Sequence, residues 1–173
     1  MRKPEFVTWT HHDGVEITQL SSTYKRDLLI DYAEKYNLRI FVETGTCGGE
    51  TIQHLLPHFD ELYSIELEPD IFASGCRRFL GNSKVHLIEG DSAVELPKLL
   101  PLIKGPALYW LDAHTDATHN GLGTDNPLMA ELHAIISQKK EGIVLVDDMD
   151  FGKKRELKDG VLRIVLDNHE TTG

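Results

Sequence analysis

A glycine-rich segment, Glu43-Thr-Gly-Thr-Cys-Gly-Gly-Glu50, follows a short apolar run and contains the residues best suited to hold a ligand. Three glycines within this segment allow tight turning and let a ligand approach the backbone N–H groups at the start of the next helix. A generic glycine-rich connection has a similar composition. Because this segment lies between a predicted buried strand and a helix, we interpret it as a ligand loop that binds through Gly45, Thr46, Gly48 and Gly49.

Polar residues also follow the next two apolar runs. Glu66 ends the second run, where a carboxylate can accept hydrogen bonds from the two hydroxyls of a ribose. The alternative is a capping or solvated glutamate, a role that suits Glu68 better because Pro69 follows it. Asp91 and Ser92 follow the third run in a Gly-Asp-Ser sequence that also makes a good turn and helix cap.

Three carboxylates, those of Asp112, Asp147 and Asp148, follow the last two apolar runs. If they converge in one apolar cleft, they repel each other unless a cation neutralises them, and all-oxygen ligation suits Mg²⁺ or Mn²⁺. In the other interpretation Asp148 caps the next helix, and alternation along the strand turns only one of the adjacent pair inward. Both interpretations stay open.

His114 stands two residues after Asp112, at the mouth of the expected site. It is a candidate general base near neutral pH or a metal ligand, although a lone histidine in a polar loop is more often neither. The connection over residues 113–126 is long for a compact domain. Long connections are commonly lids or substrate contacts, so we interpret this one as a substrate-binding segment.

The elements that must position these residues alternate between short apolar runs and helical patterns. Strands followed by covering helices, with almost continuous apolar strands, indicate a parallel sheet buried on both faces. The predicted fold class is therefore α/β, a Rossmann-like doubly wound sheet. The expected strands are 39–43, 62–67, 85–89, 107–112 and 143–147, and the expected helices are 21–36, 49–57, 69–80, 92–100 and 127–140.

The two ends of the chain are predicted separately. Residues 1–20 form an N-terminal arm or an edge strand, and residues 21–173 form a single Rossmann-like domain. The apolar positions between Lys154 and Glu170 predict a final helix, with nothing strand-like after the fifth strand. We therefore expect the sheet to lack a closing strand pair.

Composition excludes several function classes. The net charge of −10 opposes binding to a phosphate backbone, so we expect no nucleic-acid partner. No stretch has the apolar length of a signal peptide or a membrane span, so we expect no membrane association. Cys47 and Cys76 lack metal-type spacing and suit reduced thiols, which predicts a cytoplasmic protein. A homo-oligomer stays open.

Taken together, these motifs resemble those of class I S-adenosylmethionine-dependent methyltransferases, over residues 39–150. The matching segments are Phe41–Thr51, Ser64–Glu66, Glu89–Ser92, Trp110–His114 and Val144–Asp148. By this resemblance Glu43 faces the methionine part of S-adenosylmethionine, Glu66 its ribose and Asp91 its adenine. Within the class, the carboxylates after the fourth and fifth strands look like those of macrocin-type, FkbM-like, metal-dependent O-methyltransferases, which implies Asp112, Asp147 and Asp148 as metal ligands.

The resemblance implies O-methylation of a small hydroxylated acceptor, such as a sugar, with Asp112 or His114 taking the proton and a cation orienting the hydroxyl. Two alternatives stand beside it. A NAD-dependent oxidoreductase would also use Gly45 and Glu66, but Cys47 occupies the second glycine position of that fingerprint. A non-catalytic cofactor-binding or assembly module would explain a missing closing strand pair.

Overall fold

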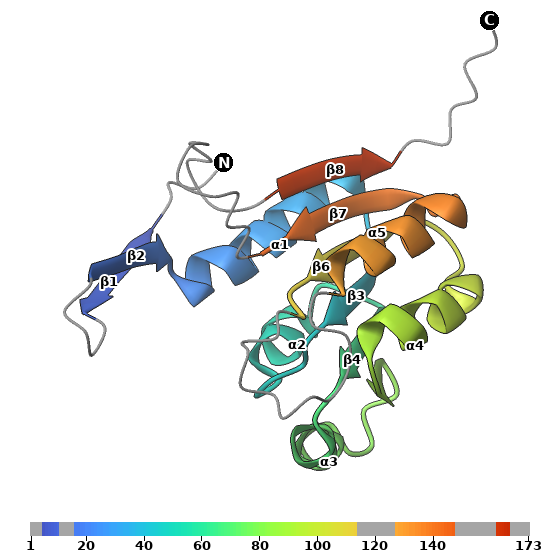
Figure 1. Ribbon diagram of the computed structural model, residues 1–173, viewed down its shortest axis with the longest axis horizontal. Helices are drawn as coiled ribbons and strands as arrows, with labels where there is room; N and C mark the ends of the chain where they lie inside the picture. Colours follow the sequence, from blue (N-terminus) through green and yellow to red (C-terminus); the bar gives the residue numbers. More distant parts are fainter. Residues whose placement is uncertain (1–4, 11–15, 114–126, 148–161, 167–173) are drawn as a thin grey trace, which may run out of the picture.

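A six-stranded sheet in the order β5-β4-β3-β6-β7-β8 forms the centre of the molecule (Figure 1). The computed structural model describes residues 5–10, 16–113, 127–147 and 162–166. Strands β3 to β7 run parallel, and β8 pairs antiparallel with β7. The strand order reverses between β3 and β6, the point at which open parallel sheets bind ligands. The strands are β3 (Ile40–Thr44), β4 (Glu61–Glu66), β5 (Val85–Glu89), β6 (Ala107–Leu111), β7 (Gly142–Val146) and β8 (Leu162–Leu166).

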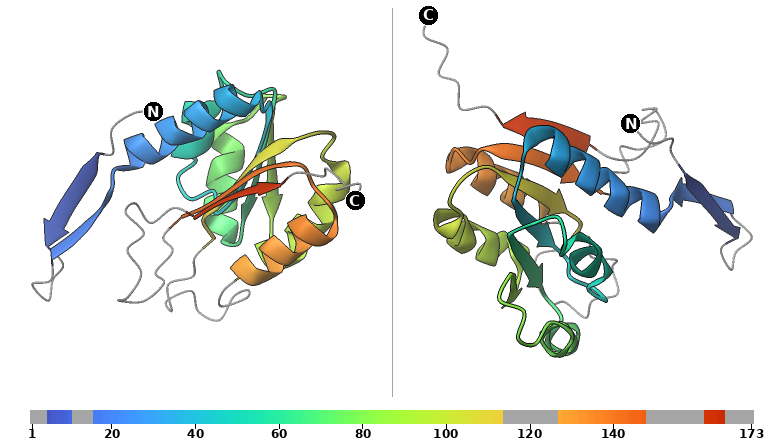
Figure 2. Two further views of the ribbon diagram at one scale, coloured as in Figure 1. Left: turned by 90° about the horizontal axis from the view of Figure 1, so that it is seen from above. Right: turned by 180° about the vertical axis from the view of Figure 1, so that it is seen from behind.

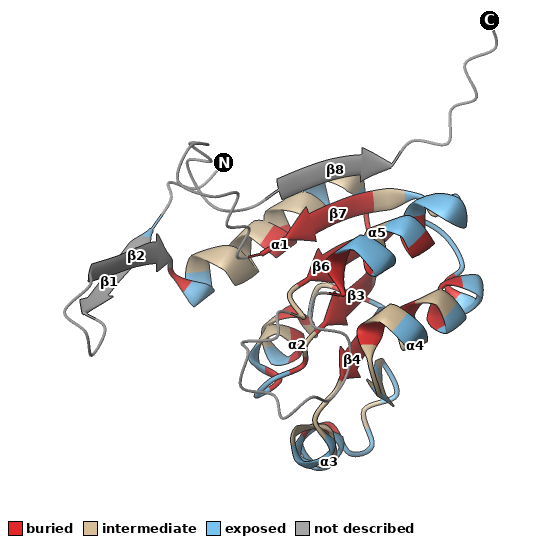
Figure 3. Cartoon of the chain, in the orientation of Figure 1, coloured by how far each residue is buried: buried red, intermediate tan, exposed pale blue. Residues whose placement is uncertain are grey.

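Helices cover both faces of this sheet (Figure 2). One face carries α1 (Ser22–Tyr36), α2 (Glu50–Leu55) and α3 (Pro69–Arg78), and the other carries α4 (Ser92–Leu99), the 3-10 helix η1 (Leu100–Leu102) and α5 (Leu128–Ser137). Alternate strand residues supply two separate cores. Phe41 packs with the α1 and α2 side, whereas its neighbour Val42 packs with the α4 and α5 side. The central strands are therefore buried on both faces (Figure 3).

Local signals explain where the covering helices begin and end. The Ser21 hydroxyl accepts a hydrogen bond from the Tyr24 N–H (3.1 Å) and caps α1. Asn37 ends α1 in the left-handed conformation, with a φ of 50°. Asp91 caps α4 by accepting from the Ala93 N–H (2.9 Å). None of the helices in the described residues is both long and apolar enough to span a membrane.

The predicted Rossmann-like fold is confirmed, and the five parallel strands begin and end within about a residue or two of their predicted bounds. The helix predicted over 154–170 is wrong where the structure describes it, because Leu162–Leu166 forms β8. Its five residues pair with Gly142–Val146, so the backbone groups along the open edge of β7 find partners. The expectation that no strand follows β7 is corrected accordingly.

The N-terminal residues form a separate two-stranded antiparallel sheet, β1 (Phe6–Thr10) with β2 (Glu16–Leu20). It lies beyond the N-terminal end of α1, away from the central sheet (Figure 1). The Ser21 N–H donates to the Glu5 carbonyl (2.8 Å), which joins this hairpin to the start of α1. In the described part of the predicted N-terminal arm or edge strand, residues 16–20 thus form a strand that pairs with β1 rather than with the central sheet.

Candidate functional site

The polar residues at the carboxyl ends of the strands gather on the face covered by α1 to α3. On β3 and β4, Glu43, Ser64 and Glu66 lie on the same side of the strands as the core residues Phe41 and Leu62, and all three are buried. Beyond β6 and β7, Asp112 and Asp147 line a cavity of about 270 Å³. Residues of the glycine loop and of the first turns of α1 also line this cavity. The structure therefore brings Asp112, Asp147 and the glycine loop together at the switch point of the sheet.

Glu43 is a buried carboxyl with only 1% of its surface exposed. Burial is the main cause that raises the pKa of Glu43, from 4.5 to about 8; the hydrogen bond from Ser64 opposes this shift, and the charge of Asp112 adds to it. Glu43 is therefore mostly neutral at pH 7 in the protein without ligand. A cation bound beside it would stabilise the ionised form and expel the proton.

A chain of hydrogen bonds holds Glu43 in place. The Ser64 hydroxyl donates to Glu43 Oε1 (2.7 Å), and Thr46 Oγ1 lies 2.6 Å from Ser64 Oγ. The register of the sheet causes this contact, because Glu43 on β3 is the direct partner of Ser64 on β4. The glycine loop is thereby tied to both strands. Ser64 was not predicted as a site residue, since its role depends on that register.

Glu66 holds the backbone of the glycine loop. Its Oε2 accepts from the Cys47 N–H (2.9 Å), and its Oε1 accepts from the Glu68 N–H (3.0 Å). Each carboxylate oxygen can accept more than one hydrogen bond, so both retain capacity for the hydroxyls of a ligand. Glu66 is 6% exposed and is therefore fixed in position at the edge of the site.

Backbone conformation explains why two positions of the predicted ligand loop, 45 and 49, are occupied by glycine. Gly45 has a φ of +89°, and a Cβ there would lie 3.0 Å from the backbone oxygen of Asp112. Gly49 has a φ of +78° and caps α2, where a Cβ would contact the ring of Phe79. Cys47 also has a positive φ, of 48°, and is exposed. The loop is thus held in a conformation that brings backbone N–H groups toward the strand ends.

Arg78, from the end of α3, also fixes the glycine loop and was missed by the sequence interpretation. Its guanidinium donates to the Gly48 carbonyl and to Glu50 Oε1 (3.0 Å). The side chain crosses from the neighbouring helix, so only the packing of α3 beside the loop reveals the contact. No local sequence signal distinguishes Arg78 from Arg77.

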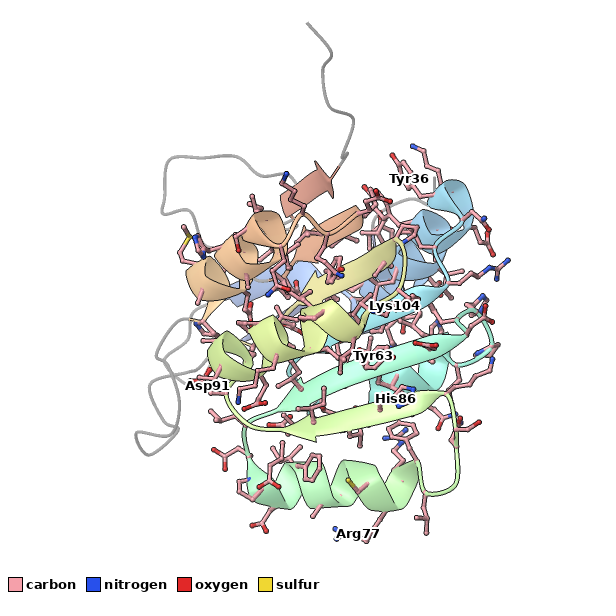
Figure 4. All side chains as sticks on the ribbon, turned by 90° about the vertical axis from the view of Figure 1, so that its right-hand side faces the viewer. Tyr36, Tyr63, Arg77, His86, Asp91 and Lys104 are labelled. Carbon is pink, nitrogen blue, oxygen red and sulfur yellow. The ribbon has the colours of Figure 1, made fainter. Side chains whose placement is uncertain are left out.

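Asp91 and Ser92 lie after β5, at the same end of the sheet as the glycine loop. Figure 4 shows Asp91 there, with His86 toward the opposite end of β5. One oxygen of Asp91 caps α4, which is the alternative role that its sequence context suggested, and Ser92 is buried. A helix cap and a ligand contact are compatible, because a carboxylate can accept several hydrogen bonds. The adenine role of Asp91 and Ser92 stays a prediction.

The predicted metal site is only partly within the described residues, because Asp148 and the candidate base His114 lie outside them. The Asp147 N–H donates to the Leu111 carbonyl (3.1 Å), which continues the β6–β7 pairing and places Asp147 beside the end of β6. Asp147 is 4% exposed, and its Oδ2 accepts from the Lys25 ammonium at 2.7 Å. Among the described residues, no three metal-binding side chains cluster. Asp147 is thus paired with Lys25, and the metal site formed by the three aspartates stays a prediction.

Lys25 is a third site residue that the sequence interpretation missed. It has a sequence signal, because it lies four and eight residues before Leu29 and Ala33, on the apolar face of α1. A lysine within such a stripe loses much of its exposure when the helix packs against the sheet; the Lys25 side chain is 13% exposed and pairs with the Asp147 carboxylate.

No known protein family and no curated protein matches the chain by sequence. Solved structures do match. The methyltransferase PaMTH1 of Podospora anserina, solved with S-adenosylhomocysteine, has a TM-score of 0.56 and 20% identity over 74% of this chain and 53% of its own. The O-methyltransferase TomG of Streptomyces achromogenes, solved with S-adenosylmethionine, has a TM-score of 0.56 and 21% identity over 74% and 56%.

The O-methyltransferase of Bacillus cereus, solved with S-adenosylhomocysteine, has a TM-score of 0.57 and 16% identity over 74% of this chain and 57% of its own. The chain therefore spans little more than half of the length of these three proteins. The likeness establishes that the chain has the Rossmann-like fold that these methyltransferases share.

Proposed function

We propose that the chain is an S-adenosylmethionine-dependent methyltransferase. The observation that carries the proposal is the pair of buried carboxyls, Glu43 and Glu66, fixed on either side of the glycine loop at the switch point of the sheet. The structures it resembles contain S-adenosylmethionine or S-adenosylhomocysteine, which supports the same cofactor here. When bound, this cofactor supplies a methyl group that is already electrophilic.

The residues of the chain then bind and orient the cofactor. Glu66 accepts hydrogen bonds from the ribose hydroxyls, and Asp91 accepts from the adenine amino group, with Ser92 beside it. Glu43 faces the positively charged methionine part, which favours its ionised form. Gly45, Thr46, Gly48 and Gly49 keep the loop backbone close to the ligand.

The acceptor in this proposal is a small hydroxylated molecule, such as the sugars implied by the likeness to macrocin-type enzymes. The cavity beside Asp112 and Trp110 is of a size that suits one such molecule. Asp112 accepts the hydroxyl proton, and His114 is the other candidate for that role. Placing the acceptor oxygen in line with the methyl group supplies most of the rate acceleration.

The cofactor assignment is tested by comparing Glu66→Gln with Glu68→Gln. We expect Glu66→Gln to weaken S-adenosylhomocysteine binding by roughly tenfold or more, because the amide keeps the shape but loses the charge that strengthens its hydrogen bonds. Glu68→Gln should bind as the wild type does, since its backbone N–H rather than its side chain contacts Glu66. Isothermal titration calorimetry measures both. Equal affinities for the two variants would contradict the role of Glu66.

The transfer step is tested by release of S-adenosylhomocysteine from S-adenosylmethionine with a panel of hydroxylated acceptors. Asp112→Asn should reduce turnover far more than it reduces cofactor affinity, because it removes the proton acceptor. If Asp112→Asn leaves turnover unchanged, the assignment of Asp112 is wrong. Cofactor binding without transfer to any acceptor would favour a non-catalytic binding module instead.

A further inference from the structure

Three buried side chains form a hydrogen-bonded chain from the sheet to the glycine loop. Ser64 Oγ donates to Glu43 Oε1 (2.7 Å) and lies 2.6 Å from Thr46 Oγ1. Glu43, Ser64 and Thr46 are 1%, 0% and 3% exposed, so water competes little for these hydrogen bonds. Glu43 belongs to β3 and Ser64 to β4, whereas Thr46 belongs to the loop. Ser64 therefore stands between the buried carboxyl and the loop.

Thr46 anchors the first turn of the loop. Its carbonyl accepts from the Gly49 N–H (2.9 Å), which closes the turn before α2. A Cβ on Gly75 of α3 would lie 3.7 Å from Thr46 Cγ2, so the methyl group is directed toward α3 and the hydroxyl toward β4. The hydroxyl of Thr46 thus ties this turn to the sheet through Ser64.

The protonation state of Glu43 decides how the two hydroxyls are oriented. A serine or threonine hydroxyl has one hydrogen to donate. An ionised Glu43 can only accept, so Ser64 donates to it and Thr46 donates to Ser64. When Glu43 carries a proton on Oε1 the chain can run in reverse, since both O···O distances suit either direction. In the ionised state both hydroxyls donate toward the charge, which strengthens the two hydrogen bonds together.

We propose that Ser64 is a positioning residue that links the ionisation of Glu43 to the anchoring of the glycine loop through Thr46. Ionisation of Glu43 strengthens the hydrogen bond between Thr46 and Ser64, and by linkage this hydrogen bond favours the ionised carboxyl. The link depends on the three side chains alone. Its consequence for the cofactor rests on the proposed function, in which the positively charged methionine part ionises Glu43 and so tightens the loop that binds the same cofactor.

The test must leave the charges around Glu43 in place. Burial raises the pKa of Glu43 most, and the hydrogen bond from Ser64 lowers it. The charged groups nearby are three carboxylates that raise this pKa further and two basic residues of α1 that line the neighbouring cavity, namely Asp112, Glu66, Glu50, Lys25 and Arg26. Substitutions that remove only the hydroxyl of Ser64 or Thr46 retain all five groups, so they report on the hydrogen-bonded chain.

Titration of the Glu43 carboxyl by ¹³C NMR, in the full chain without cofactor, tests the link. Loss of one carboxyl signal in Glu43→Gln assigns it. The proteins compared are the wild type, Ser64→Ala, Thr46→Val, Thr46→Ser and the double variant Ser64→Ala/Thr46→Val. Thr46→Val keeps the shape of the side chain without the hydroxyl, whereas Thr46→Ser keeps the hydroxyl. Ser137→Ala is the matched control, because it also removes one hydroxyl, which donates to the Ala134 carbonyl at the end of α5.

Ser64→Ala should raise the pKa of Glu43 by roughly 1 or more, because the ionised carboxyl loses its donor. Thr46→Val should raise it by roughly 0.2–0.5, since Thr46 acts on Glu43 through Ser64. Thr46→Ser and Ser137→Ala should leave it unchanged, and Thr46→Val should have no further effect once Ser64 is alanine. An unchanged pKa in Thr46→Val would overturn the inference, whether or not Ser64→Ala folds. A Thr46→Val shift that persists without the Ser64 hydroxyl would overturn it too.

Calorimetry with S-adenosylhomocysteine on the same samples separates the two proposals. Cofactor binding by the wild type together with an unchanged pKa of Glu43 in Thr46→Val would refute the link and leave the proposed function intact. The expected pattern of pKa values without any cofactor binding would support the link and refute the proposed function.

Discussion

Replacing Glu43 by glutamine removes the most strongly perturbed titratable group at the site. The amide oxygen can still accept the hydrogen bond from Ser64, so the substitution removes the titration and keeps the shape. Glu43→Gln therefore isolates the energetic consequence of burying an ionisable carboxyl against the glycine loop.

The expected magnitude follows from the shift in pKa of Glu43 from 4.5 to about 8. Because the folded pKa lies above the unfolded value, the native state binds more protons, and its stability falls as pH rises between these two values. Integrated from pH 5 to pH 8, the shift corresponds to a loss of roughly 3–4 kcal/mol in the free energy of unfolding. Glu43→Gln should abolish this loss.

Urea unfolding of wild type and Glu43→Gln across this pH range measures the difference. The free energy of unfolding of the wild type should fall relative to that of Glu43→Gln as the pH rises toward 8, so the variant becomes increasingly the more stable of the two. Glu89→Gln is the matched control, because Glu89 is exposed at the end of β5 and should leave the slope of the wild type unchanged.

Cofactor binding gives a second readout of the same group. At pH 7 a carboxyl with a pKa near 8 holds about 0.9 of a proton, and a positively charged ligand that lowers this pKa releases most of it. Calorimetry in buffers of different ionisation enthalpy should therefore detect proton release when the wild type binds S-adenosylmethionine. The Glu43→Gln variant should release fewer protons, by about 0.9 per molecule bound. Identical pH dependence of unfolding in the wild type and the variant would refute the reasoning.

Two further substitutions test how the glycine loop is held. Gly45→Ala should cost roughly 1–3 kcal/mol of stability and weaken S-adenosylhomocysteine binding, because its φ is +89° and the new Cβ would press on the Asp112 carbonyl. Gly81→Ala is the control, because Gly81 has a φ of +80° but no atom near the new Cβ. It should cost stability in urea unfolding and leave S-adenosylhomocysteine binding intact. Equal losses of S-adenosylhomocysteine affinity in Gly45→Ala and Gly81→Ala would contradict this account. Arg78→Met should weaken cofactor binding by a few-fold, since it frees the loop from α3. It should cost under about 1 kcal/mol in urea unfolding, because the ion pair with Glu50 is exposed. Unchanged calorimetric affinity would show that the arginine does not order the loop.

Much of the site was predictable because it depends on short-range patterns. A buried strand, a glycine loop and a helix occur within about 15 residues, and period-two alternation places Glu43 with the core residues of one face. Parallel strands bring their carboxyl ends to the same edge, so Glu66 and Asp112 could be placed near the loop before the structure was known. The positions of these residues follow from rules that act along a single element.

The contacts that escaped prediction depend on how elements pack together. Ser64 reaches Glu43 through the β3–β4 register, and Lys25 reaches Asp147 through the docking of α1. The error over Leu162–Leu166 has the same origin, because its apolar residues suit either a helix or a strand and the open edge of β7 decides between them. Such choices are made by tertiary pairing and not by local sequence.

Calorimetric titration of the wild-type chain with S-adenosylhomocysteine and, separately, with NAD tests the central claim most directly. The account predicts one S-adenosylhomocysteine bound per chain, with an affinity that does not change when Mg²⁺ or a chelator is added, and far weaker binding of NAD. Tighter binding of NAD, or no binding of S-adenosylhomocysteine, would contradict it.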